Sequence, residues 1–106
     1  MSANTPGDEP AVGGVTSDGA VRVRYWAAAR AAAGTDGDVV PVGAGATLGE
    51  VLDAVLRMHP DRPRLATVLP VCSVLVGDRP VTARDPDTVR VSAGDTVELL
   101  PPFAGG

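Results

Sequence analysis

The chain ends in the segment 101–106, Pro-Pro-Phe-Ala-Gly-Gly, whose last two residues are Gly105 and Gly106. Glycine has no Cβ, so a backbone of two glycines fits through a channel that is too narrow for other residues. Such an ending presents its terminal carboxylate, which becomes an acyl donor once it is activated. With 13 glycines in 106 residues, a terminal pair also arises by chance in about one chain in a hundred. The ending suggests chemistry at the C-terminus and needs support from the rest of the sequence.

Other side chains that could do chemistry are few. Cys72 lies inside an apolar segment that we predict to be a strand, where a lone cysteine usually acts as a small hydrophobe. His59 falls at the end of a predicted helix, where the helix dipole favours its charged form, and the sequence shows no partner base or nucleophile for it. Asp85 and Asp87 flank a proline, a pattern that more often shapes a turn than holds a metal. We therefore predict no metal site.

Composition excludes several classes of function. The formal net charge is -4 and all nine basic residues are arginine, so an acidic domain without a basic cluster is a poor match for nucleic acid. No run approaches the roughly 20 apolar residues of a membrane helix, and the N-terminus lacks the pattern of a signal peptide. One cysteine excludes a disulfide framework and fits a reducing compartment. We expect no nucleic-acid or membrane partner, and a cytoplasmic location.

Residues 1–20 differ from the rest of the chain. They contain two prolines, several glycines and serines, and no Leu, Phe, Tyr or Trp, so they cannot bury enough apolar surface to offset the entropy of ordering. We predict a disordered, inert arm over 1–20 and one domain over 21–106, including a flexible tail at 101–106.

The first half of the domain predicts two strands and two helices. Alternation of apolar and polar residues predicts a strand over 21–26, and the alanine-rich segment 27–33 predicts a short helix ended by Gly34. A β-branched run predicts a second strand over 38–42. Thr47 and Glu50 have the spacing of a capping box, which starts a helix that must end by His59, before a proline. Apolar residues at helical spacing would lay one stripe of this helix on a sheet.

The second half predicts mainly strands. Residues 61–70 are interrupted by prolines and have the apolar residues for one further helical turn. We predict strands over 71–76, 88–91 and 96–100, with a short return strand beginning at Val81. The order of elements is that of an α+β domain.

Several motifs in this order resemble those of the ubiquitin-like β-grasp sulfur carriers of the MoaD/ThiS family, and most closely its branch of molybdopterin synthase small subunits. The resemblance covers residues 21–106. It rests on segments 21–27, 34–35, 47–48, 74–78, 93–97 and 99–106 together with Arg30, of which Ala-Gly-Asp-Thr-Val followed by Leu-Leu-Pro-Pro-Phe-Ala-Gly-Gly is the most specific. It implies an α+β, ubiquitin-like β-grasp fold with a mixed sheet of four to five strands crossed by one main helix. The long arm and the alanine-rich first helix depart from the family pattern.

The resemblance also implies a function. An E1-like adenylating enzyme, using ATP and Mg²⁺, would adenylate Gly106, and the sulfur of a persulfide sulfurtransferase would displace AMP to leave a thiocarboxylate. The loaded tail would insert into the large subunit of molybdopterin synthase, in a heterotetramer, and pass sulfur to cyclic pyranopterin monophosphate in molybdenum cofactor biosynthesis. The chain would bind no cofactor itself and would not be an enzyme alone, but the small subunit of a sulfurtransferase.

The residues expected to serve this chemistry lie at the tail. Gly106 and Gly105 would form the reactive end, and Pro102, which fixes its backbone φ, would lower the entropy of presenting it. Phe103 and Ala104 would contact the partner. Leu100 would join an apolar docking patch, although alternation alone leaves open whether Leu100 or its neighbour Leu99 belongs to the core.

Three alternatives remain open from the sequence. The same carrier chemistry could serve cysteine, thiamine or a sulfur-containing metabolite. The domain could instead be a non-catalytic ubiquitin-like interaction module with an inert tail. Conjugation to lysines of other proteins is neither supported nor excluded.

Overall fold

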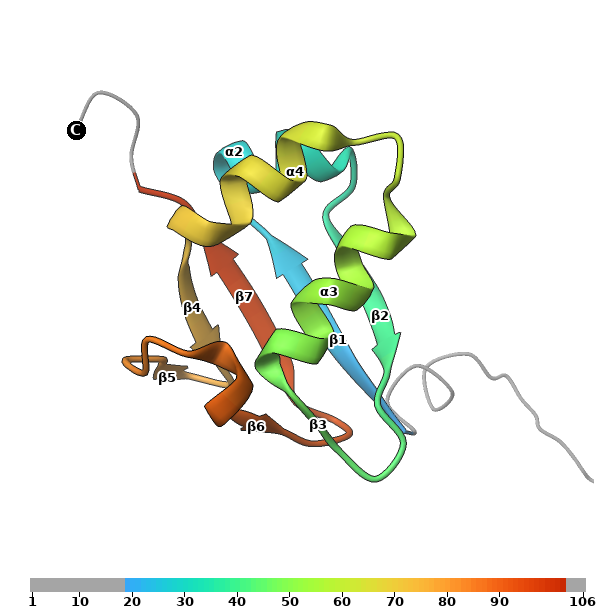
Figure 1. Cartoon of the computed structure of the whole chain (residues 1–106), viewed down its shortest axis with the longest axis vertical. Coiled ribbons are helices and arrows are strands. Elements are labelled where there is room, and N and C mark those ends of the chain that lie inside the picture. The colour runs from blue at the N-terminus through green and yellow to red at the C-terminus, as the bar shows by residue number, and fades with distance from the viewer. Residues whose placement is uncertain (1–18, 103–106) are drawn as a thin grey trace, which may run out of the picture.

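The computed structural model describes residues 19–102, which form a mixed sheet with helices packed on one face (Figure 1). Residues 1–18 of the expected arm and the residues after Pro102 lie outside the described residues, whereas Ala20, the last residue assigned to the arm, is the buried first residue of β1. The sheet has five strands in the order β2-β1-β7-β4-β5. Its members are β1 (Ala20–Tyr25), β2 (Gly37–Pro41), β4 (Ser73–Val76), β5 (Arg79–Pro80) and β7 (Thr96–Leu100). This arrangement confirms the predicted α+β class and a mixed sheet of up to five strands.

Two strands occupy the middle of the sheet. β1 and β7 run parallel, with Tyr25 opposite Leu99, and the other pairings are antiparallel. In β1 and β7, alternate residues are buried under the helices, and the residues between them face the other side. We call this second side the open face, because no described element covers it within residues 19–102 (Figure 1).

The main helix is α3 (Leu48–Met58), which crosses the sheet (Figure 1). The predicted capping box is confirmed: the Glu50 amide donates to the Thr47 hydroxyl at 3.0 Å, and the Thr47 amide donates to the Glu50 carboxylate at 2.9 Å. His59 caps the other end, as predicted. The apolar stripe of α3 packs on the sheet in a core whose fully buried side chains are Val21, Val23, Leu48, Val51, Val55, Leu65, Val91, Val97 and Leu99.

The two shorter helices complete the layer on the same face. α2 (Ala27–Ala33) ends where Gly34 takes a left-handed conformation with φ of 77°, as the sequence predicted. α4 (Pro63–Val68) confirms the expected further helical turn and packs against α2. A 3-10 helix, η2 (Leu69–Val71), continues directly from α4.

Several predicted strand limits were wrong. The strand predicted over 71–76 begins at Ser73, because Pro70 keeps the preceding residues in η2. The return strand is β5, and Val81 follows it, donating its amide to the Val74 carbonyl at 2.8 Å. Cys72 therefore lies before the strand and not inside it, and its thiol donates to the carbonyl of Val68 at 3.4 Å.

The segment predicted as a strand over 88–91 also differs. Its first residue, Thr88, belongs to a second 3-10 helix, η3 (Pro86–Thr88), which the Asp85 carboxylate caps by accepting from the Asp87 amide. Val89 is extended but unassigned to a strand, and only β6 (Arg90–Val91) forms a strand. It pairs with the unpredicted strand β3 (Ala46–Thr47) in a separate two-stranded sheet.

Candidate functional site

The candidate site begins where β7 ends. Leu99 lies opposite Tyr25 of β1 and Val74 of β4, and Leu100 lies opposite Ser73, so strands on both sides hold the end of β7. Pro101 is half-buried and Pro102 is exposed. The structure thus delivers the chain to the surface at the end of a central, doubly paired strand.

The alternation along β7 decides which leucine is core. Leu99 is fully buried under the helices, whereas Leu100 is half-buried and alternates to the open face. Of the residues predicted for the site, Leu100 and Pro102 are therefore placed at the surface of the strand end. Phe103, Ala104, Gly105 and Gly106 lie outside the described residues.

Trp26 adjoins this strand end and was not among the predicted site residues. Its backbone amide donates to the carbonyl of Leu99 at 3.1 Å, and its indole Nε1 donates to a carboxylate oxygen of Glu98 at 3.0 Å. The guanidinium of Arg24 lies 5.0 Å from the ring centroid, within cation–π range. The side chain still exposes 40% of its surface. The signal in the sequence was the strand alternation, which places Trp26 on the same side as Arg22 and Arg24.

The backbone beside Trp26 is strained. Ala27 has a φ of 49°, a left-handed conformation that residues with a Cβ rarely adopt. This conformation carries the chain from the end of β1 directly into α2 and leaves Trp26 as the N-cap residue of that helix. Such strain persists only where the surroundings enforce it. The preceding residue, Trp26, is held to β7 by both its backbone amide and its indole.

A second exposed apolar residue flanks the strand end on its other side. Val71 exposes 60% of its surface and lies in η2, two residues before Ser73, the partner of Leu100. We name this surface the tail exit. It consists of Trp26, Val71, Leu100, Pro101 and Pro102. Large exposed aromatic and aliphatic side chains around one point are typical of a contact surface for another protein.

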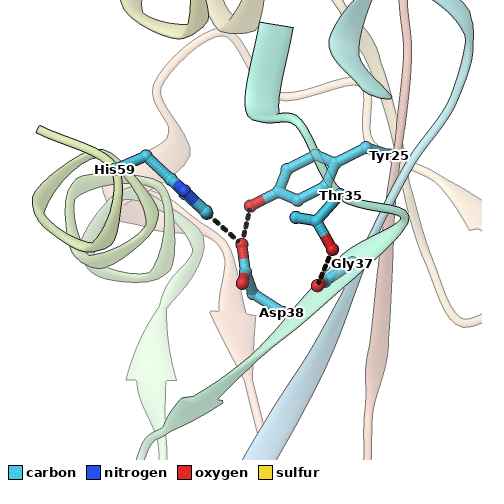
Figure 2. Close-up of polar contacts among 5 residues, drawn as sticks. All are labelled: Tyr25, Thr35, Gly37, Asp38 and His59. Carbon is cyan, nitrogen blue, oxygen red and sulfur yellow. Dashed lines mark hydrogen bonds and ion pairs between the residues drawn. The ribbon is translucent and has the colours of Figure 1, made fainter. Parts of the chain in front are cut away.

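A polar cluster joins the end of β1 to β2 and to the C-terminal end of α3 (Figure 2). One carboxylate oxygen of Asp38 accepts from the Tyr25 hydroxyl and lies within hydrogen-bonding distance of His59 Nε2, both at 2.6 Å. The Tyr25 and His59 rings meet edge to face, with centroids 6.4 Å apart. Burial raises the pKa of Tyr25 far above its usual range, and the hydrogen bond and negative charge of Asp38 raise it further. Tyr25 therefore remains a donor that ties the end of β1 to β2 and to α3.

The other candidates from the sequence have local roles. Asp85 caps η3, in agreement with the turn-shaping role expected for this carboxylate. Burial raises the pKa of the Cys72 thiol to about 11, so Cys72 is protonated at neutral pH and is a weak nucleophile. Within the part of the chain that the structure describes, no group of three or more His, Cys, Asp or Glu could hold a metal ion. Nor does any described helix combine the length and apolar character that crossing a bilayer requires.

Comparison with known proteins identifies the class. The model of the ThiS family matches residues 23–106, and the chain belongs to that family. It is 28% identical over 86 residues to the molybdopterin synthase sulfur carrier subunit of Chlamydomonas reinhardtii, covering 81% of this chain and 98% of that relative.

Solved structures agree with this assignment. SAMP1 from Haloferax volcanii superposes with a TM-score of 0.65 and 26% identity, covering 83% of this chain and all of that one. The complex of subunits 1 and 2 of molybdopterin-converting factor from Helicobacter pylori contains a chain with a TM-score of 0.55 and 25% identity, covering 82% of this chain and 99% of that one. These likenesses confirm the predicted ubiquitin-like β-grasp fold.

Proposed function

We propose that this protein is a sulfur carrier whose terminal Gly106 is converted to a thiocarboxylate and that it supplies sulfur for molybdopterin synthesis. The observation that carries the proposal is the tail exit: the Pro-Pro-Phe-Ala-Gly-Gly segment follows a central strand whose end is held on both sides and flanked by exposed apolar residues. Membership in the ThiS family supports the carrier chemistry. The Chlamydomonas relative supports the pathway.

The proposed chemistry follows from the weakness of a carboxylate as an electrophile. The Gly106 carboxylate attacks the α-phosphorus of ATP on an activating enzyme, and pyrophosphate leaves. The terminal sulfur of a persulfide then attacks the acyl carbon and AMP leaves. This attack forms a bond between sulfur and the acyl carbon, so the carrier stays joined to the sulfurtransferase through the sulfur–sulfur bond of the original persulfide. A thiol must finally cleave that sulfur–sulfur bond, forming a disulfide with the sulfurtransferase and releasing the thiocarboxylate. The activating enzyme supplies Mg²⁺ and the groups that stabilise the developing charge.

The large subunit of molybdopterin synthase is the proposed acceptor partner, in a cytoplasmic heterotetramer that acts on cyclic pyranopterin monophosphate. The complex from Helicobacter pylori supports a partner of this kind. On the present chain, Trp26, Val71 and Leu100 would contact both the activating enzyme and the large subunit, each in turn, at the tail exit while the tail enters the partner. The rigid strand end would fix the direction of entry and reduce the entropy lost on docking.

Intact mass spectrometry tests this function. The protein is incubated with an enzyme that activates carriers of the ThiS family, together with ATP, Mg²⁺, a persulfide donor and a thiol reductant. Loading exchanges one oxygen for sulfur and adds about 16 Da. Gly106→Ala should lower loading strongly, because its methyl group obstructs the narrow channel around the glycine pair, and should leave the far-UV spectrum and melting temperature unchanged. Normal loading of that variant, or no gain of mass in the parent, would contradict the proposal.

A second candidate function is that of a protein modifier. It is favoured by the likeness to SAMP1, whose name stands for small archaeal modifier protein 1. It would use the same adenylated terminus but transfer it to lysines of other proteins. The chain has no lysine, so it could not extend itself into lysine-linked polymers. Conjugates of higher mass that resist reducing agents would identify a modifier, and their absence beside a thiocarboxylate would identify a carrier.

A further inference from the structure

An apolar groove lies between α3 and the β4–β5 edge of the sheet, with a volume of about 650 Å³. Its walls come from Leu52 and Leu56 of α3, Leu69 of η2, and Val74 and Val81 on the side of β4. These side chains are buried or half-buried. The volume and apolar character are those of a site that takes a small ligand or a short peptide.

The two ends of the groove differ in chemistry. Leu48, the first residue of α3, lies at one end, where its amide donates to the Val89 carbonyl and α3 packs against η3. The exposed Arg84, two residues before η3, is the one charged residue among those lining the groove. Leu56, in the last turn of α3, lies at the other end with Leu69 and Cys72. The helix rises about 12 Å between Leu48 and Leu56. The groove therefore offers an apolar bed of this length with a positive charge at one end.

We propose that this groove binds the C-terminal segment 103–106 of a second copy of the chain. Phe-Ala-Gly-Gly combines an aromatic anchor, small residues and a terminal carboxylate. Four extended residues span about 13 Å, which matches the length of the groove. With Phe103 near Leu56 and Leu69, the carboxylate reaches Arg84, and a guanidinium binds a carboxylate through paired hydrogen bonds.

The prolines explain why the occupant is a second copy and not the same chain. Ser73 lies opposite Leu100, so the Cys72 end of the groove lies near the point where the chain's own tail begins. To lie in its own groove, the tail would have to reverse direction there and return along β4. A residue that precedes proline is held extended, and this applies to both Leu100 and Pro101. A reversal beginning only at Pro102 leaves too few residues to reach Arg84.

Binding of this kind would shield the reactive terminus. A tail held in the groove of another molecule is not available to an activating enzyme, so loading efficiency would fall as the protein concentration rises. Binding of the tail requires only the groove and the sequence of the tail, whatever the terminus is used for.

The test uses the full-length protein labelled with ¹⁵N and titrated with the unlabelled peptide Pro-Pro-Phe-Ala-Gly-Gly. We expect saturable shifts at the amides of Leu52, Val74 and Arg84. Amidation of the peptide terminus, or Arg84→Gln, should each weaken binding by about fivefold, the upper effect of an exposed ion pair. Arg79→Gln is the matched control, because Arg79 is exposed on the adjacent β5 but does not line the groove.

Sedimentation velocity provides the second measurement. The parent protein should self-associate with increasing concentration, and Phe103→Ala should reduce this association. The proposal is overturned if the groove shows no saturable shifts. It is also overturned if the amidated peptide binds as strongly as the free-acid peptide and Arg84→Gln binds the peptide as strongly as the parent protein does. If the NMR shifts of the groove amides change in Phe103→Ala but do not change on dilution, the groove is occupied by the chain's own tail, and the proposal of a second copy is overturned. Arg84→Gln should load sulfur normally in dilute solution, so the two proposals can fail separately.

Discussion

At the scale of the residue, Trp26 connects the strand end to the surface. Its backbone amide donates to the carbonyl of Leu99, its ring contacts Arg24 and Glu98, and the residue as a whole remains 40% exposed. Exposed tryptophans that are already held in one orientation lose little entropy on docking and are common energetic centres of interfaces. We therefore predict that Trp26→Ala lowers the kcat/KM for loading by about tenfold or more, with less than about 1 kcal/mol lost in the free energy of unfolding.

The matched control for this prediction is Val39→Ala. Val39 exposes 37% of its surface and lies on the open face, but on β2, with β1 between it and β7. Loading assays over a range of protein concentrations and urea unfolding would measure both quantities. An equal loss of kcat/KM in the two variants would show that Trp26 has no special part in docking.

Cys72 gives a prediction about pH. Burial raises the pKa of its thiol to about 11, whereas an unfolded cysteine ionises near pH 8.5. Alkylation by iodoacetamide at pH 8 should be roughly two hundredfold slower in the folded protein than in urea, and its rate should rise until about pH 11. The folded state holds this proton more tightly, so the contribution of Cys72 to stability is complete below about pH 8.5 and declines as the pH rises through 11. A folded-state midpoint near 8.5 would contradict the assigned burial.

At the scale of the element, the sequence was most informative where structure depends on near neighbours. The capping box of α3 and the glycine that ends α2 involve residues within a few positions, and both were predicted. The short pair β3–β6 was missed because its strands have two residues each and are separated by more than 40 positions. The cluster of Tyr25, Asp38 and His59 was missed for the same reason, since its contacts join residues 13 and 21 positions apart.

Gly37 illustrates a constraint that no local pattern reveals. It begins β2 opposite Arg24, and a Cβ at this position would lie 2.4 Å from the carbonyl oxygen of Val23. The obstacle is backbone within a paired strand, which cannot move without breaking the sheet. We predict that Gly37→Ala lowers the free energy of unfolding by about 2 kcal/mol or more.

Gly43→Ala separates this steric effect from the general cost of replacing glycine. Gly43 has a φ of 56° but nothing within 4 Å of an added Cβ, so only about 1 kcal/mol of backbone strain is expected. Urea unfolding of both variants would measure the difference. Equal destabilisation would mean that β1 and β2 separate easily at this end.

At the scale of the whole molecule, the topology separates two tasks. β1 and β7 are central strands that other strands hold from both sides, and β7 delivers the tail to one end of the sheet. The groove begins near that end, at Cys72 and Ser73, and extends along β4 on the side of the sheet that carries α3. The terminus can therefore be presented to a partner without disturbing the core, while a separate surface remains available to bind another terminus.

The two prolines control which of these surfaces the tail can reach. Replacing Pro101 and Pro102 with alanine should leave the fold intact, because Pro102 is exposed and Pro101 only half-buried. It should lower the kcat/KM for loading by about five- to thirtyfold, since each proline contributes up to about 1 kcal/mol by restricting the free chain. The freed tail could also turn back, so shifts at the groove would become independent of protein concentration in the double variant and remain dependent on it in the parent. NMR spectra recorded over a dilution series would measure this change, and identical dilution behaviour in both proteins would show that the prolines do not direct the tail.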